Sequence, residues 1–292
     1  MRVTDTAIYG RIGHHVGQAR QRLDAATRSL MSGVKHDQPS ANPAYTARLT
    51  RLDRDLARTD RWTQSIDRTR TVYQTAEATI ASSSELVSEL QAMAVQMANG
   101  SVSAADRKSS ASVVLERLAD LQGQAKTTIA GRFLFSGRRE GVAPFDAAGN
   151  YVGDTVGRTL PIADGRSVAG DVIGSEVFGS GATSAFAVLA DFAKALETND
   201  VAGIQTAIAS LTQTHDQMVS ARTRVGVVLQ SLESTSALHA DHRVALEIRR
   251  AELADPDIAA QSSELSFSEN VLQSVVETSK RLMSSLRSAT LE

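Results

Sequence analysis

Apolar residues recur every three or four positions along most of the chain, and this spacing predicts long amphipathic helices. Near the start, the steps of three and four form a heptad seam over three repeats: Tyr9, Ile12, Val16, Ala19, Leu23, Ala26 and Leu30. Near the end, a second seam has the same register: Ile258, Ser262, Leu265, Leu272, Val276, Ser279, Met283 and Leu286. Both apolar stripes are narrow. We therefore expect them to form assembly interfaces, and the terminal helices to be marginal in an isolated monomer.

The stretch "LMSGVKHDQPSANP", residues 30–43, interrupts the helical pattern. Gly33 follows the last seam residue, where a glycine in the left-handed conformation ends a helix. Pro39 cannot continue that helix. Asn42 is predicted to cap the second helix, with Pro43 at its first position. This second helix is expected to run to about residue 98.

The stretch "LADPD" repeats this device before the last helix. Asp255 is the expected N-cap, and Pro256 is expected at the first helical position.

The amino-acid composition changes at residue 131, because residues 131–181 hold 11 of the 19 glycines and two of the five prolines. Apolar residues come there in short pieces, which predicts a small β-rich insert. Asp164-Gly165 is a strong hairpin signal within it. We expect the insert to be a separate unit whose removal leaves the helices folded.

The predicted fold class is mainly α. A long antiparallel helical rod or coiled coil is made from both termini, and it carries the small β-rich inserted domain. This prediction divides the chain into five segments: an N-terminal assembly segment 1–43, the outgoing half of the rod 44–130, the insert 131–183, the returning half of the rod 184–254, and a C-terminal assembly segment 255–292.

Composition removes several function classes. The chain has no cysteine, which excludes disulfides, thiolate nucleophiles and cysteine-based zinc sites. No apolar run reaches the ~18 residues of a membrane span, and the N-terminus lacks the apolar core of a secretory signal. We therefore expect no membrane partner and no cleaved signal peptide.

The net charge of −2 is unevenly placed, since residues 1–70 carry +6 and the remainder −8. An arginine stripe lies along one helical face, but Asp53, Asp55 and Asp60 lie among its members, which argues against nucleic acid. The stripe consists of Arg48, Arg51, Arg54, Arg58 and Arg61.

Candidate catalytic and metal-binding patterns are weak. His239 and His242 lie three residues apart on a helix, but no third ligand accompanies them. The chain has no phosphate-binding glycine loop and no nucleophile elbow. We expect neither an enzyme nor a metal or other cofactor.

Three motifs, in this order along the chain, resemble the flagellin superfamily. The first is "MRVTDTAIY" followed by the seam and the turn with Pro39, Ser40 and Pro43; Ala41 and Asn42 stand where the family has two acidic residues. The second is "GRFLFSGRREGVAPFDAAGNYVGDTVG" at 131–157, and the third is "ARTRVG" at 221–226 with the closing helix after "ELADPD". The first two resemble the hook–filament junction branch more than the filament subunit.

The resemblance implies a non-catalytic structural adapter of the bacterial flagellum, located outside the cell after export without a cleaved signal. It implies as partners hook-associated protein 1, flagellin, further copies in a ring-like layer, and a flagellar export chaperone. Two alternatives stay open: a flagellin filament subunit and a cytoplasmic coiled-coil scaffold.

Overall fold

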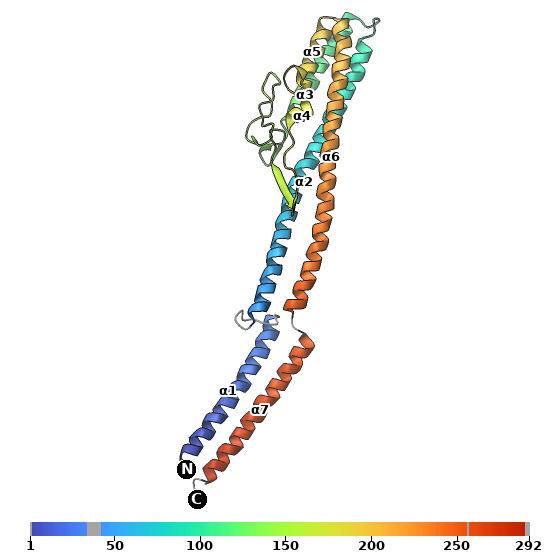
Figure 1. The fold of residues 1–292 in the computed structure, drawn as a ribbon. Helices are drawn as coiled ribbons and strands as arrows, with labels where there is room; N and C mark the ends of the chain where they lie inside the picture. The colour runs from blue at the N-terminus through green and yellow to red at the C-terminus, as the bar shows by residue number, and fades with distance from the viewer. Residues whose placement is uncertain (1, 34–41, 256, 290–292) are drawn as a thin grey trace. The chain divides into compact units, whose positions relative to one another are not determined.

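Six long or medium helices make up most of the protein. The computed structural model describes residues 2–33, 42–255 and 257–289 (Figure 1). The helices are α1 (Arg2–Ser32), α2 (Pro43–Met97), α3 (Ala104–Ala125), α5 (Ala185–Glu197), α6 (Val201–Ala254) and α7 (Ile258–Ala289). The predicted fold class, mainly α with long helices and a small β-rich region, is confirmed.

The region between α3 and α5 contains two small antiparallel sheets. One joins β1 (Thr128–Ile129) to β2 (Arg132–Phe133), and the other joins β3 (Thr159–Ala163) to β4 (Arg166–Ala169). The β3–β4 hairpin turns at Asp164-Gly165, as the sequence predicts, and Gly165 has a φ of 71°. A short helix, α4 (Gly174–Phe178), and a 3₁₀ turn, Gly181–Thr183, follow.

Contacts divide the chain into two compact units. The terminal unit contains residues 1–58 and 241–292, and the central unit contains residues 59–240. Helices α2 and α6 each supply residues to both units. The finer division into five segments stays a prediction.

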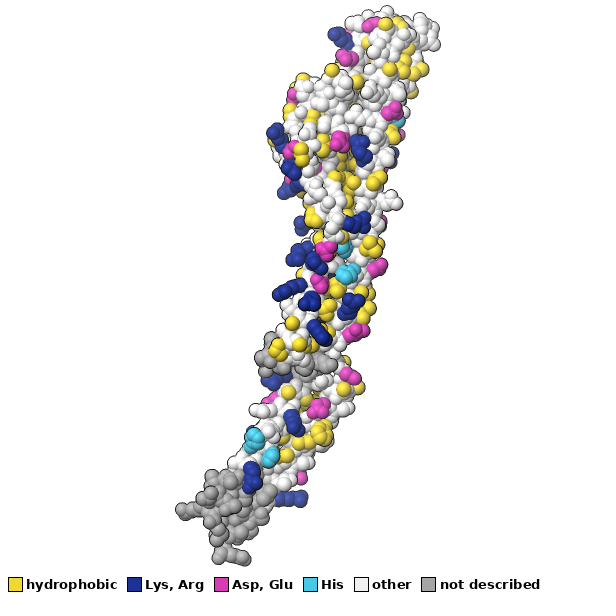
Figure 2. All heavy atoms as spheres, in the orientation of Figure 1, with side chains coloured by type: hydrophobic (Ala, Val, Ile, Leu, Met, Phe, Trp, Pro, Cys, Tyr) yellow, Lys and Arg dark blue, Asp and Glu magenta, His cyan; other side chains and the backbone are white. Residues whose placement is uncertain are grey.

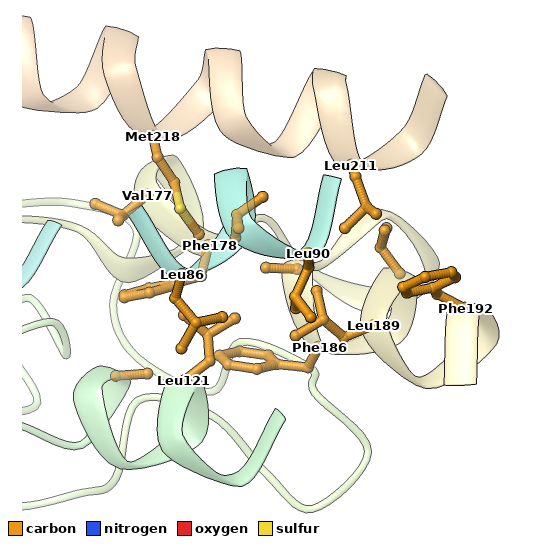
Figure 3. Close-up of a cluster of buried hydrophobic side chains, with 14 of the residues drawn as sticks. Leu86, Leu90, Leu121, Val177, Phe178, Phe186, Leu189, Phe192, Leu211 and Met218 are labelled. Atoms are coloured by element: carbon orange, nitrogen blue, oxygen red, sulfur yellow. The ribbon is translucent and has the colours of Figure 1, made fainter. Parts of the chain in front are cut away.

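The central unit has a large apolar core built from five helices. Leu90 of α2, Leu121 of α3 and Leu211 of α6 are fully buried. The side chains of Phe178 and Phe186 point into the space between these helices (Figure 3). The rings of Phe178 and Phe186 are stacked, with their centroids 5.8 Å apart.

The insert does not have a core of its own. Phe135 and Phe145 pack in the same buried cluster as side chains of α2, α3, α5 and α6. Phe135 meets Phe178 edge to face with centroids 5.2 Å apart, and Phe145 meets Phe186 at 4.9 Å. Three aromatic side chains of the insert, Phe135, Phe145 and Phe178, thus fill a core that the insert shares with the helices. This shared core argues against the expectation that the helices do not depend on the insert.

A buried arginine closes the turn between α2 and α3. The Arg107 guanidinium donates to the carbonyl oxygens of Met97 and Asn99, each at 2.9 Å, and to Asn199 beyond α5. Ser103 caps α3 by accepting from the Asp106 amide at 3.1 Å. These bonds satisfy donors and carbonyls that a helix end leaves without partners.

Candidate assembly surfaces

The two terminal helices pack against each other along the first predicted seam. Helices α1 and α7 run antiparallel, so the described ends of the chain lie at one end of this pair (Figure 1). On α1, Ala19 and Ala26 are buried, while Val16, Leu23 and Leu30 are half-buried. The side chains of Tyr9 and Ile12 lie outside the described residues. The α1 face toward α7 is therefore the expected one, and it is lined mainly by small side chains.

The second seam is shifted relative to the prediction. Leu265, Leu272 and Val276 are half-buried, but among the α7 residues whose burial is described, Ser268 is the most buried, with an exposed fraction of 3%. Ile258 is the first residue of α7 and is 70% exposed. The side chains of Met283 and Leu286 lie outside the described residues.

A buried hydroxyl weakens this seam further. Within the described residues, the Ser268 Oγ has no hydrogen-bond partner. A buried polar group without a partner destabilises a fold by about 1–3 kcal/mol. The α1–α7 contact thus combines small apolar side chains with an unsatisfied polar atom.

Gly33, Asn42 and Pro43, the described residues beside the turn after α1, have the geometry that the sequence predicts. Gly33 has a φ of 63°, and its amide donates to the Ser29 carbonyl at 3.1 Å. Asn42 caps α2, since its Oδ1 accepts from the Tyr45 amide at 3.1 Å, and Pro43 is the first helical residue. Pro39 lies outside the described residues.

The cap of α7 is Asp257 rather than Asp255. The Asp257 Oδ1 accepts from the amides of Ala259 and Ala260 at 3.0 and 3.1 Å. Asp255 still donates its amide to the Ala251 carbonyl at 2.8 Å, so it belongs to the end of α6. Pro256 lies outside the described residues. The sequence offers two aspartates, and the backbone geometry selects the second.

The terminal unit exposes large apolar side chains that no monomer contact covers. Met31, Ile258 and Phe267 are 83%, 70% and 59% exposed. Exposed apolar groups of this size are suited to contacts with other chains. The predicted assembly role of the terminal helices is consistent with this exposure, and it stays a prediction.

Arginines dominate the visible face over α2 (Figure 2). Arg58 pairs with Asp55 at 3.1 Å, and Arg250 of α6 pairs with Asp53 at 2.8 Å. The hydrogen bond to Asp53, together with its charge, raises the pKa of Arg250 above its usual value. Asp55 therefore neutralises one arginine of the predicted stripe, whereas Asp53 pairs with an arginine outside it.

A groove of about 780 Å³ lies in the central unit between α2 and the β region, and we call it the basic groove. Its apolar floor includes Val72, Phe133 and Leu160. Its four arginines outnumber its two acidic residues; the six are Arg61, Arg68, Arg132, Arg158, Glu140 and Asp171.

The β-side charges of the basic groove are already paired. Arg158 contacts Glu140 and binds Asp171 at 2.6 Å, and Arg132 binds Glu140 at 2.9 Å. The hydrogen bond from Arg158 to Asp171 is the largest cause of the raised pKa of Arg158. This network fixes the β-side wall of the groove.

Two polar residues fasten the β3–β4 hairpin to the helices, a role that the sequence did not predict for either. The Tyr73 hydroxyl donates to the Ala169 carbonyl at 2.9 Å, and burial together with the nearby Asp171 charge raises the Tyr73 pKa to about 12. His239 Nε2 donates to the Ile162 carbonyl at 2.6 Å, and its ring stacks on Trp62 with centroids 5.2 Å apart. The pair of histidines considered for a metal thus includes one that serves the hairpin.

The described residues contain no group of three or more potential metal ligands close enough to hold one ion. Across residues 2–33, 42–255 and 257–289, no helix has both the length and the apolar character needed to cross a bilayer. What the geometry offers is therefore surfaces: exposed apolar side chains on the terminal helices and a charged groove beside the hairpin.

Comparison with known protein families gives one family match. The bacterial flagellin N-terminal helical region matches residues 11–140. Over 269 residues, the chain is 24% identical to flagellar hook-associated protein 3 of Escherichia coli (strain K12), which covers 84% of this chain and 85% of that protein.

Solved structures share the fold. A putative flagellar hook-associated protein from Vibrio parahaemolyticus aligns with a TM-score of 0.68 at 19% identity, covering 74% of this chain and all of that one. Flagellar hook associated protein-3 from Legionella pneumophila aligns with a TM-score of 0.63 at 13% identity, covering 69% and 98%. The resemblance to the flagellin superfamily seen in the sequence motifs is confirmed.

Proposed function

Because the chain carries a flagellin N-terminal helical region and matches a flagellar hook-associated protein over most of its length, we propose that it is a structural adapter of the bacterial flagellum. It forms the junction layer between the hook and the flagellin filament. The observation that carries this proposal is the extent of the match, which covers 84% of the chain rather than one motif.

The partners follow from the position of such a layer. On one side the adapter contacts hook-associated protein 1, on the other the first flagellin subunits, and laterally further copies of itself in a ring-like layer. The terminal helices supply the assembly contacts, because their seams are thin and Phe267 and Ile258 remain exposed. The protein reaches the extracellular end of the hook by export without a cleaved signal, accompanied inside the cell by an export chaperone.

A filament subunit is the second candidate, because the matched family model describes flagellin itself. The two functions differ in the number of copies per flagellum and in the flagellar structures that remain when the gene is deleted. A filament subunit is needed in every layer, whereas a junction adapter is needed once, before the filament starts.

Deletion of the gene in the source bacterium tests the proposal. We expect cells that complete their hooks, carry no filaments and release unpolymerised flagellin into the medium. Re-expression of the chain should restore filaments. A deletion strain that keeps filaments of normal length would refute the junction role, and one without any flagellin in the medium would favour the filament subunit.

A further inference from the structure

The α2 wall of the basic groove carries charges that the monomer does not neutralise. Arg61 and Arg68 line the groove from α2, seven residues apart and so on one face of the helix. In the central unit as described, neither guanidinium has a carboxylate partner, whereas Arg132 and Arg158 opposite them do. The groove is therefore a site with an apolar floor and two available cationic groups, which suits an acidic segment.

An acidic patch lies elsewhere on the same unit. It consists of Glu85 and Glu89 of α2 together with Glu116 and Asp120 of α3, each pair one helical turn apart. Arg117 lies between the helices, 3.6 Å from Glu89 and 3.5 Å from Asp120. One arginine among four exposed carboxylates leaves the patch with a charge of about −3 at neutral pH.

The patch and the groove cannot meet within one chain. From Arg68 to Glu85, α2 advances by 17 residues, which is about 25 Å along its axis and about 100° around it. Two complementary surfaces on different faces of one rigid helix form a heterologous contact, in which each copy binds the next and is bound by the previous one.

We propose that the basic groove of one copy binds the acidic patch of a second copy, with Arg61 and Arg68 facing Glu85 and Glu116. Neighbouring copies are then displaced along α2 by roughly 30 Å, the separation of the two surfaces along the helix. Charge complementarity selects a second copy as the occupant. Because each copy is displaced in the same sense, the repeated contact places identical chains along a helical path within the layer. This inference rests on the proposed function, because it describes how copies in the junction layer contact each other.

Cysteine cross-linking of assembled flagella tests the contact directly, since the chain has no native cysteine. Ser65 lines the groove, and Ser88 lies between the acidic residues on the exposed face of α2. These serines are 23 residues apart on one helix, about 35 Å, so a short cross-linker cannot join them within a chain. We expect the Ser65→Cys, Ser88→Cys chain, treated with a short bis-maleimide on isolated flagella, to give a ladder of covalent dimers and larger products.

Each single-cysteine chain is the matched control and should give no ladder. A double-cysteine chain that is present on flagella without linking more than these controls would overturn the proposed contact and leave the junction function intact. Absence of the wild-type chain from isolated flagella would instead refute the junction function. The two failures are therefore distinguishable.

Charge exchange gives an independent test. We expect Arg61→Glu with Arg68→Glu to lower incorporation into flagella about tenfold, and Glu85→Lys with Glu116→Lys to do the same. A chain with all four changes should regain incorporation. Lys108→Glu with Arg166→Glu, two exposed sites outside the groove, has the same charge change as the arginine pair and should incorporate normally.

If the four changes together restore nothing, the groove binds a protein other than a second copy, and the proposal is overturned. Normal incorporation of the arginine variant would overturn it as well. Secreted amounts of each variant in the medium, measured in parallel, separate failed export from failed assembly.

Discussion

The central unit and the α1–α7 pair use the same secondary structure and differ in what they bury. The central unit encloses aromatic and leucine side chains contributed by α2, α3, α5, α6 and the insert, with Phe135, Phe178 and Phe192 almost fully buried. The α1–α7 seam buries alanines and Ser268 and leaves its leucines half-exposed. Two regions with equal helix content therefore differ in expected stability. The apolar area buried per residue decides the free energy of unfolding, because burial must offset the entropy lost on ordering the chain.

Truncation of a core aromatic is expected to have the largest effect. Phe178→Ala should destabilise the central unit by about 3–5 kcal/mol, because the lost ring leaves a cavity among Phe135, Phe145 and Phe186. Phe267→Ala on the exposed face of α7 is the control and should change stability by less than about 0.5 kcal/mol. Urea unfolding followed by circular dichroism measures both. Equal effects would mean that the two units are stabilised alike.

Limited proteolysis compares the units within one molecule. We expect the isolated monomer to be cut before Ala44 and after Ala254 about a hundredfold faster than in the central unit, because local opening of a thin seam requires little free energy. The resistant fragment should contain the central unit. Mass spectrometry of the first products gives the cut sites. Termini as resistant as the middle would contradict the idea that they become stable on assembly.

Alkaline pH should weaken the central unit through Tyr73. Its pKa is about 12 in the folded state against 10.0 for the free side chain, so the folded state keeps the proton longer than the unfolded one. That contribution is present below pH 10 and is lost as the pH rises toward 12, at most about 2–3 kcal/mol. Thermal unfolding between pH 9 and 11.5 measures the loss. Tyr73→Phe should show a smaller loss, with a remainder from Tyr151, whose pKa burial also raises to about 12.

Substitution of Gly33 tests the end of α1. Gly33→Val should cost about 1–2 kcal/mol, since a β-branched residue is strained at a φ of 63°. Apart from the adjacent backbone, no described atom lies within 4 Å of the position where its Cβ would be, so the expected cost comes from backbone strain rather than from a clash. Gly33→Asn should be milder, because asparagine tolerates this conformation. Circular dichroism measures the loss of terminal helicity in each variant. Equal losses in Gly33→Val and Gly33→Asn would argue against a strained turn.

A smaller effect of opposite sign is expected at Ser268. Ser268→Ala removes the buried hydroxyl without a partner and should stabilise the α1–α7 pair by about 0.5–1 kcal/mol. Slower proteolysis of the termini would show this stabilisation. Ser266→Ala, at an exposed position of the same helix, is the control. If Ser268→Ala accelerates cleavage, the hydroxyl makes a favourable contact in solution.

Periodicity predicted the helices well because each is long and repeats its apolar spacing many times. The bounds expected for the second helix, about 44–98, agree with Pro43–Met97, and Gly33 and Asn42 have their expected roles. These features depend on local chemistry: a proline, a capping side chain, a glycine at positive φ. Local chemistry can be read from neighbouring residues.

Long-range pairing could not be predicted in this way. The Tyr73 and His239 bonds join residues 96 and 77 positions apart, and no spacing rule connects them. The sequence also did not predict that insert and helices share a core, because this core joins residues far apart in the chain. Phe135 and Phe145 lie among glycines and resemble loop residues. At Asp255 and Asp257, two equivalent caps stood two residues apart, and only the path of the backbone distinguishes them.

The stacking of Trp62 on His239 gives the molecule an internal optical signal. Trp62 is the single tryptophan, so all indole emission comes from one contact, beside the residue whose ring holds the β3–β4 hairpin. The indole ring therefore reports on an aromatic contact that also positions the hairpin. Detachment of the hairpin from α2 and α6 would change the surroundings of this indole, so tryptophan fluorescence would report it without any added label.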